Sequence, residues 1–103
     1  MKRELILSKQ ARRQLIEIDE YIAADGYPDG AERIVNSIGE LCKTLLDYPY
    51  IGVTRDDLRV GLRTIPWRKK ATIAYAVSDT AIEIIGIFYG GRDYESLLRD
   101  ESE

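Results

Sequence analysis

The first half of the chain repeats its apolar residues at the spacing of an α-helix. Between Ala11 and Ile22 the intervals are four, three and four positions, which places these residues on one helical face. Ser8 can accept hydrogen bonds from the amides of the next turn, and Gly26 tolerates the left-handed conformation that ends a helix. The pattern predicts a helix from about Ala11 to Ile22, preceded by a short strand from Glu4 to Leu7.

A second apolar stripe, from Ala31 to Leu45, predicts another helix that begins at Pro28 and ends near Tyr48. Pro28 suits a first helical turn because its missing amide hydrogen is not needed there, and Pro49 ends the helix. Cys42, the single cysteine, lies on this stripe, and we interpret it as a small buried hydrophobe. Only a few residues separate the two helices, so we expect an antiparallel helical hairpin whose apolar faces are covered by a sheet.

The second half of the chain predicts strands. Val60 to Ile65 ends at Pro66, Thr72 to Val77 follows, and Ile82 to Tyr89 is the third of the set. The polar segment Ser78-Asp79-Thr80 is short enough to join the last two strands as a hairpin turn.

The last strand carries apolar side chains on both faces. Alternation predicts two sets of residues, with Ile82, Ile84 and Phe88 on one face and Ile85 and Ile87 on the other. A strand of this kind lies inside its sheet or is covered on both sides. Asp93 can cap a final short helix from Tyr94 to Arg99, and the acidic tail of residues 99–103 is expected to fray.

These elements predict one α+β domain over residues 1–103, in the order β-α-α-β-β-β(-α). We expect an antiparallel sheet with the N-terminal helical hairpin packed on one face. No apolar run approaches the roughly 20 residues of a membrane helix, and Leu5 to Leu7 is too short for a signal-peptide core. We therefore expect a cytoplasmic protein with no membrane partner.

Charge is distributed unevenly in this histidine-free chain of net charge −3. Residues 55–70 contain six positive side chains and two aspartates, a net +4 that leaves −7 for the remainder. Such asymmetry favours a basic side that meets an acidic partner, although a solvated edge that deters aggregation is an equal alternative. With no histidine and one cysteine, we expect no metal site and no cofactor.

Two groups of residues in the basic stretch are candidates for binding. Arg59 and Arg63 are four positions apart, so both lie on one face of a regular strand and suit an acidic peptide or phosphates. Trp67 precedes Arg68-Lys69-Lys70 in a turn that we expect to be exposed, as at many recognition tips. The alternative for Trp67 is a ring folded back over the sheet edge.

Several segments in a shared order carry a family pattern: Ala11-x3-Leu15-x2-Ile18-x2-Tyr21-Ile22-Ala23, Tyr48-Pro49-Tyr50-Ile51-Gly52, Asp57-Leu58-Arg59-Val60-Gly61-Leu62-Arg63, Ile73-Ala74-Tyr75 and Gly91-Arg92-Asp93. Over nearly its whole length, the chain resembles the ParE branch of the RelE/ParE superfamily of bacterial toxins. The resemblance implies a toxin that binds DNA gyrase and stalls it on DNA. It also implies a cognate, ParD-like antitoxin whose C-terminal segment wraps the toxin and silences it.

Within this resemblance we expect the antitoxin to contact Arg59, Arg63 and Trp67. The residues expected to contact the target are Arg68, Lys69, Arg92, Tyr94, Leu97 and Leu98. We expect no sequence-specific binding to nucleic acid.

The resemblance also suggests an alternative, because RelE-type relatives cut messenger RNA in the ribosome. Such cleavage needs a base, an acid and a cation, which Arg63, Tyr89 and Arg92 can supply. ParE-like chains often carry a histidine shortly before the arginine–aspartate pair, where this chain has Tyr89. An arginine near a carboxylate, as in Arg92 and Asp93, is more often architectural than catalytic, so we favour a non-enzymatic toxin over a ribonuclease. A third alternative is a member that binds only its antitoxin.

Overall fold

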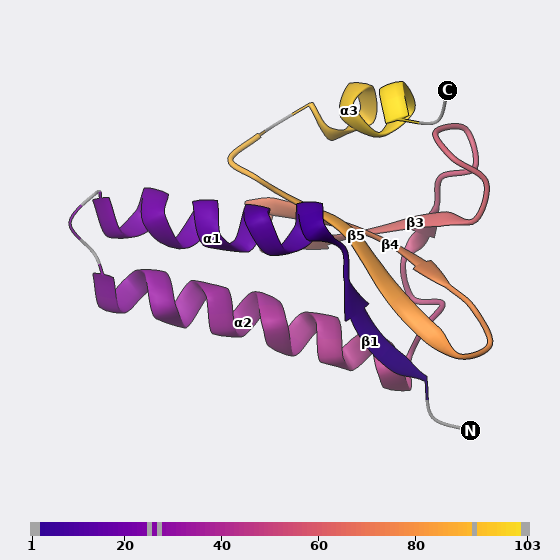
Figure 1. Cartoon of the computed structure of the whole chain (residues 1–103), viewed down its shortest axis with the longest axis horizontal. Helices are drawn as coiled ribbons and strands as arrows, with labels where there is room; N and C mark the ends of the chain where they lie inside the picture. The colour runs from indigo at the N-terminus through magenta and orange to yellow at the C-terminus, as the bar shows by residue number, and fades with distance from the viewer. Residues whose placement is uncertain (1–2, 25, 27, 92, 102–103) are drawn as a thin grey trace.

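The fold is a five-stranded sheet with helices on both faces (Figure 1). The computed structural model describes residues 3–24, 26, 28–91 and 93–101. In chain order the elements are β1 (Glu4–Leu7), α1 (Lys9–Ala24), α2 (Pro28–Asp47), β2 (Val53–Thr54), β3 (Leu62–Trp67), β4 (Ala71–Val77), β5 (Ala81–Tyr89) and α3 (Tyr94–Glu101). The α+β class and the antiparallel helical hairpin are confirmed.

The strands lie in the order β1-β5-β4-β3-β2. β1 pairs with β5 in parallel, whereas the other pairs are antiparallel, so the expectation of a wholly antiparallel sheet is wrong at one edge. The segment from Pro49 to Asp57, in which no strand was predicted, contains the short edge strand β2. Alternation along a strand specifies which face is buried but does not specify the neighbouring strand.

Pro66 lies inside β3 instead of ending it, and the strand begins two residues later than expected, at Leu62. The outer partner β2 pairs only with Arg63 and Thr64. Pro66 therefore lies where β3 is itself the edge of the sheet, and a missing amide hydrogen is tolerated there.

A β-bulge in β5 changes which side chains share a face. Ala74 pairs with Gly86 but Tyr75 pairs with Ile84, so Ile85 is an extra residue in the strand. The expected alternation is therefore correct for Ile82 and Ile84 and inverted beyond the bulge. Ile87 joins Ile82 and Ile84, whereas Phe88 packs on the opposite face with Ile85.

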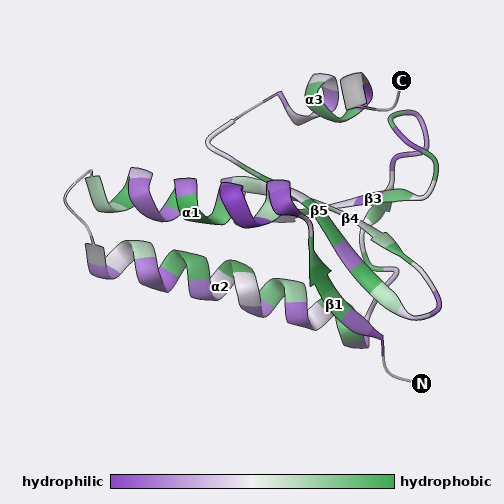
Figure 2. Ribbon diagram, viewed as in Figure 1, coloured by the Kyte–Doolittle hydropathy of each residue, from purple (hydrophilic) through white to green (hydrophobic). Residues whose placement is uncertain are grey.

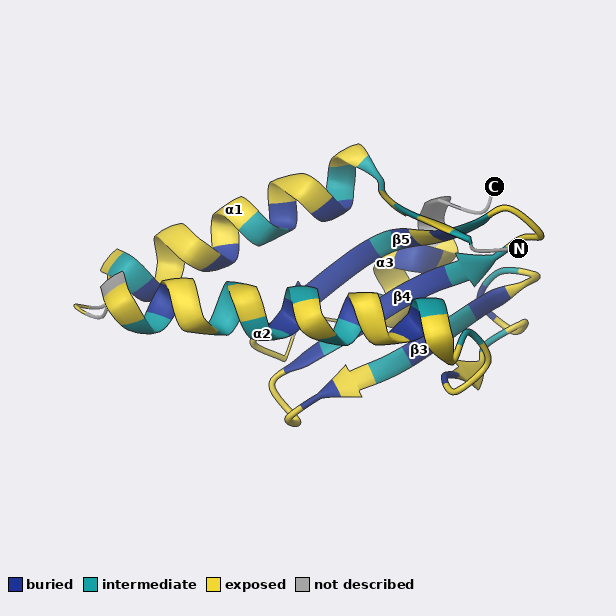
Figure 3. Ribbon diagram, turned by 90° about the horizontal axis from the view of Figure 1, so that it is seen from below, coloured by how far each residue is buried: buried dark blue, intermediate teal, exposed yellow. Residues whose placement is uncertain are grey.

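Two hydrophobic cores result from this double-sided strand. The first core lies between the α1–α2 hairpin and the sheet, and it includes Ile18, Ile38, Tyr75 and Ile84. Figure 2 shows hydrophobic residues along β1 and β5, and Figure 3 shows buried residues where α2 crosses the sheet. The second core lies on the opposite face beneath α3 and consists of Leu58, Leu62, Ala74, Phe88 and Leu98.

The predicted helix caps are present. Ser8 Oγ accepts a hydrogen bond from the amide of Ala11 at 3.0 Å, and Asp93 Oδ1 accepts one from Ser96 at 3.2 Å. α3 continues to Glu101, two residues beyond the expected end at Arg99. Residues 102 and 103 of the expected frayed tail lie outside the described part of the chain.

Side chains at the start of α1 cover the edge of β5 beyond the end of β1. Ser8 donates through its amide to the carbonyl of Ile84 at 3.0 Å and through its hydroxyl to that of Ile85 at 2.8 Å. Gln14 is only 5% exposed, and its Oε1 accepts a hydrogen bond from the amide of Ile87 at 2.6 Å. Polar groups of α1 thus replace the missing neighbouring strand at the bulge.

We expect the substitution Gln14→Ala to lower the free energy of unfolding by about 1–3 kcal/mol, because it leaves the buried amide of Ile87 without an acceptor. Glu20→Ala, at an exposed position of the same helix, is the matched control and should change stability by less than about 0.5 kcal/mol. Urea denaturation of the three proteins measures this difference. Equal stabilities for the two variants would contradict the role of Gln14.

Candidate partner-binding surfaces

Arg55 is bound within the molecule and attaches α3 to the loop before β3. Its guanidinium donates two hydrogen bonds to Asp57, at 3.0 and 2.9 Å, and further bonds to Glu95 and to the Tyr94 hydroxyl. Hydrogen bonds to Asp57 and Glu95 raise the pKa of Arg55 above its ordinary value, and Arg55 in turn lowers the pKa of Asp57. Asp57 and Glu95, which contribute to the negative net charge of the chain, are therefore paired within the molecule.

Arg59 also holds α3, through a hydrogen bond of 3.2 Å from its guanidinium to the carbonyl of Leu98. Leu98 is fully buried in the second core, so the expectation that its side chain contacts a target directly is wrong. Tyr94 lies with its ring centroid 6.1 Å from that of Phe88 and is half-buried. Of the described α3 residues that were expected to contact a target, Leu97 is the exposed one, at 43%.

Arg59 and Arg63 do not share a strand face. Arg59 lies in the turn before β3, where Gly61 adopts a φ of 83°, and its side chain reaches α3. Arg63 pairs with Tyr75 of β4, so the side chain of Arg63 lies on the face of the sheet that carries the first core, opposite to α3. The even spacing failed as a guide because the strand begins only at Leu62.

Arg63 holds the loop that follows α2. It donates to the carbonyls of Gly52 at 2.8 Å and Tyr50 at 3.2 Å, and its guanidinium carbon lies 5.0 Å from the centroid of the Tyr50 ring. Tyr75 supports the same loop from inside, since its hydroxyl accepts from the Gly52 amide and donates to the Pro49 carbonyl, both at 2.9 Å. Burial raises the pKa of Tyr75, which therefore keeps its proton for the second bond.

The loop and β2 display an apolar surface at the open edge of the sheet. We call it the tyrosine rim and define it as Tyr48, Tyr50, Ile51 and Val53, with exposures between 49% and 64%, flanked by Arg3 and Arg63. Arg3 donates to the Ser78 carbonyl at 2.7 Å and to the Tyr50 hydroxyl at 3.4 Å. Exposed aromatic side chains beside cations, in a loop that leads into an edge strand, suit a protein partner.

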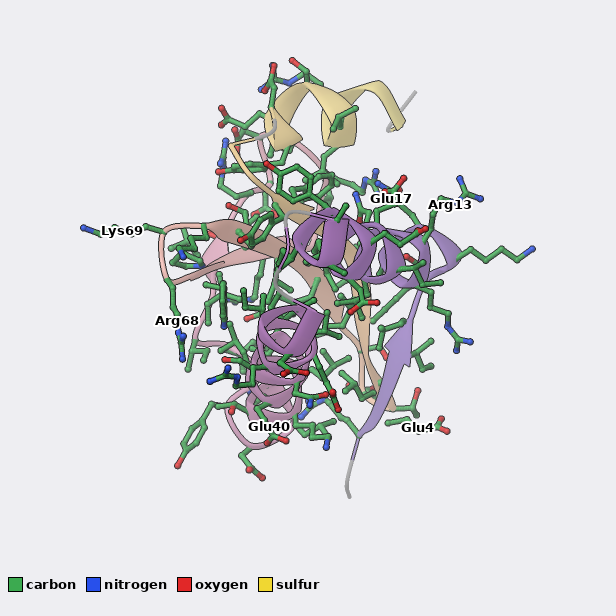
Figure 4. All side chains as sticks on the ribbon, turned by 90° about the vertical axis from the view of Figure 1, so that its left-hand side faces the viewer. Glu4, Arg13, Glu17, Glu40, Arg68 and Lys69 are labelled. Carbon is green, nitrogen blue, oxygen red and sulfur yellow. The ribbon has the colours of Figure 1, made fainter. Side chains whose placement is uncertain are left out.

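The β3–β4 connection displays three exposed cations, Arg68, Lys69 and Lys70, which we call the basic turn. Arg68 and Lys69 have φ values of 49° and 59°, and the amide of Lys70 bonds to the Trp67 carbonyl at 2.9 Å. A left-handed conformation costs a residue with a Cβ about 1–2 kcal/mol. Figure 4 shows Lys69 reaching away from the body of the molecule, whereas Arg68 runs along its side.

Trp67 is not exposed at this turn, contrary to the main expectation for it. Its side chain is 5% exposed and packs in the first core, and its indole nitrogen donates to Ser37 Oγ at 3.1 Å. The guanidinium carbon of Arg68 lies 5.0 Å from the centroid of the indole ring. The alternative of a ring folded over the sheet edge is therefore correct, and Trp67 supports the turn without presenting a surface to a partner.

The residues suggested for RNA cleavage are not brought together. Arg63 pairs with Tyr75, whereas Tyr89 pairs with Ala71, four positions away along β4. At the rise of a β-strand this separates the two backbone positions by roughly 13 Å. Arg92, the third residue of that set and an expected target contact, lies outside the described residues.

Tyr89 instead lines a shallow groove of about 370 Å³ between α1 and the end of β5. The groove is lined by Gln14, Glu17, Ile18, Tyr21, Ile87, Tyr89 and Gly90. The sequence analysis missed Gln14, although a polar residue on the apolar face of the first helix was a signal. Cys42 is buried, which raises the pKa of its thiol to about 11 and suits an inert packing role.

Within the described ranges, no group of three or more histidine, cysteine, aspartate or glutamate residues could hold a metal ion. Of the helices in that part of the chain, none combines the length and apolar character needed to cross a membrane.

Comparison with known proteins supports the expected fold. The sequence profile of the family described as "ParE toxin of type II toxin-antitoxin system, parDE" matches residues 5–94. A chain from the structure titled "Chromosomal ParDE TA system from P. aeruginosa" is similar, with a TM-score of 0.75 and 22% identity over 86% of this chain and 97% of that chain. A search among curated proteins found no match. The RelE/ParE-like fold is therefore confirmed.

The pairing of Arg55 with Asp57 predicts a pH-dependent stability. Because the folded-state pKa of Asp57 is depressed, its contribution is present at neutral pH and is lost as pH falls through that pKa, below the unfolded value of about 3.9. We expect Asp57→Asn to unfold more easily than the unsubstituted chain at pH 7. The difference should narrow as the pH falls below the unfolded value of about 3.9.

Thermal unfolding followed by circular dichroism between pH 2.5 and pH 7 measures this dependence. Asp79→Asn, in the exposed β4–β5 turn, is the control that removes a carboxylate of no known contact. A gap between Asp57→Asn and the unsubstituted chain that has not narrowed at pH 2.5 would show that the pair does not act through the ionised carboxylate.

Proposed function

Because the chain belongs to the family of ParE toxins of type II toxin–antitoxin systems, we propose that it inhibits DNA gyrase by binding it and is neutralised by a cognate antitoxin. The observation that carries this proposal is the family match over residues 5–94, together with the shared fold. The similar solved structure belongs to a ParDE toxin–antitoxin system, which supports an antitoxin as the partner of this chain.

The proposed action is adhesion without covalent chemistry. The separation of Arg63 from Tyr89 along the sheet supports this view, because general acid–base catalysis needs its groups within hydrogen-bond reach of one substrate. The absence of histidine removes the side chain that most often moves protons near neutral pH.

We assign the antitoxin contact to the tyrosine rim. Tyr50 is the centre of this surface, since it is 59% exposed and lies beside the guanidinium groups of Arg3 and Arg63. An extended antitoxin segment can pair with the open edge of β2, place apolar side chains on the rim and direct carboxylates to the arginines. Arg59 and Trp67 take no part in this assignment, because one holds α3 and the other is buried.

We assign the contact with the gyrase–DNA complex to Leu97 on α3 and to the basic turn. Leu97 is an exposed apolar residue on a helix that Arg55 and Arg59 hold in place, so little conformational entropy is lost when it is buried by a partner. The basic turn adds charge that attracts an acidic surface over a longer range.

The gyrase contact predicts the effect of Leu97→Asp on supercoiling of a relaxed plasmid by purified gyrase. The unsubstituted chain should inhibit the reaction, and the substitution should raise the concentration needed by about tenfold or more, because a charge replaces an apolar contact residue. Ile16→Asp is the matched control, since Ile16 is an exposed aliphatic residue on α1.

Normal supercoiling at high concentrations of the unsubstituted chain would refute the proposal. In the same preparations, new cuts in messenger RNA on translating ribosomes would favour the ribonuclease alternative.

The antitoxin contact predicts the effect of Tyr50→Ala. This substitution should weaken the complex with the cognate antitoxin by about thirtyfold, the size expected of an aromatic hot spot worth about 2 kcal/mol, while leaving gyrase inhibition unchanged. Tyr21→Ala is the control, because Tyr21 is 71% exposed on α1, away from the rim. Calorimetric titration measures both, and an equal loss in the two variants would contradict the assignment.

A further inference from the structure

The basic turn uses residues that its backbone conformation does not favour. A β-turn with positive φ at both central positions ordinarily contains Asn-Gly, because side chains with a full Cβ crowd the backbone there. In this chain the two positions are Arg68 and Lys69, with φ values of 49° and 59°. Folding alone therefore does not account for the identity of these residues, which points to a function for their charges.

The turn is also the centre of the longest stretch without acidic residues. From Leu58 to Ser78 the sequence has five arginines and lysines and no aspartate or glutamate, a net charge of +5. Since the whole chain has a net charge of −3, the remainder has −8. Three of these five cations, Arg68, Lys69 and Lys70, are exposed at the turn itself, so the turn is a locally positive region that attracts a polyanion.

The cations are presented on a rigid support. Trp67 is buried and bonded to Ser37, and the guanidinium of Arg68 lies over its ring. Figure 4 shows Arg68 and Lys69 on the opposite side of the molecule from Arg13 on α1. The turn therefore projects from a buried support, and the guanidinium of Arg68 is held beside that support.

The chemistry of the basic turn suits phosphates better than a protein surface. Trp67 and Ala71, which flank the turn on its two strands, are each 5% exposed, so neither can anchor in a pocket of a protein partner. Arginine and lysine side chains provide what phosphate groups need, namely positive charge and hydrogen-bond donors.

We infer that the basic turn binds the phosphate backbone of double-stranded DNA without reading its sequence. This inference rests on the proposed function, because gyrase acts on a DNA duplex. The turn contacts the DNA while α3 contacts the enzyme, so the toxin bridges the two.

The substitution pair Arg68→Asn with Lys69→Gly separates binding from stability, since it removes two charges and supplies the residues that the turn conformation favours. Binding of the chain to a fluorescent duplex of about 20 base pairs is measured by anisotropy at several salt concentrations. The unsubstituted chain should bind at low salt, and the double variant at least tenfold more weakly. The slope of log affinity against log salt should become shallower by about 2, at about 0.9 per lost phosphate contact.

The thermal unfolding midpoint of the double variant should be equal to or above that of the unsubstituted chain. The single substitution Lys70→Gln is a second variant that leaves the strained positions unchanged, and it should make the salt slope shallower by about 1. The pair Lys9→Gln with Arg13→Gln removes the same charge from exposed positions of α1 and should leave DNA affinity within about twofold.

Equal losses in the α1 pair and the turn pair would overturn the inference by showing a bulk charge effect. Competition by polyglutamate as effective, charge for charge, as competition by unlabelled duplex would also overturn it, in favour of an acidic protein. Gyrase inhibition that is unaffected by the turn pair, in a chain that does not bind DNA, would remove this inference but leave the proposed function standing. DNA binding through the turn without gyrase inhibition would keep this inference and remove the proposed function.

Discussion

The attachment of α3 by Arg55 and Arg59 determines which surfaces of this molecule are available to partners. β5 is apolar on both faces, and the α1–α2 hairpin covers only one of them. A helix of eight residues must therefore cover the other face, and a helix of this length has little stability of its own. Hydrogen bonds from two arginines to the side chains and backbone of α3 supply the attachment that the buried Leu98 alone would not.

This arrangement changes the meaning of the basic stretch. Of its arginines, Arg55 and Arg59 hold α3, and Arg63 holds the loop around Gly52. In the sequence these cations form one basic stretch. In the structure some of them make internal hydrogen bonds and others lie at the exposed basic turn. Within the basic stretch, the cations open to a partner are those of the basic turn, together with Arg63 where it flanks Tyr50.

Helices were predictable from the sequence because their signals are local. Ser8, Pro28 and Asp93 act within one turn of the helix that each of them begins, and the structure places α1, α2 and α3 close to the expected positions. The parallel pairing of β1, the bulge at Ile85 and the burial of Trp67 depend on contacts distant in sequence, such as the bond from Trp67 to Ser37. A pattern of alternating residues contains no information on such contacts, and for that reason the face of Phe88 and the surroundings of Arg59 were predicted wrongly.

Arg55 and Arg59 hold α3 in place, whereas we propose that Arg68 acts on a partner. Replacing each arginine singly with glutamine, and measuring growth inhibition together with the amount of folded toxin in the same cells, tests this assignment of roles most directly. We predict that Arg55→Gln and Arg59→Gln lose toxicity in proportion to lost folded protein, and that Arg68→Gln loses toxicity at an unchanged level of folded protein. Full toxicity of Arg68→Gln, or full abundance with lost toxicity for Arg55→Gln and Arg59→Gln, would contradict the account.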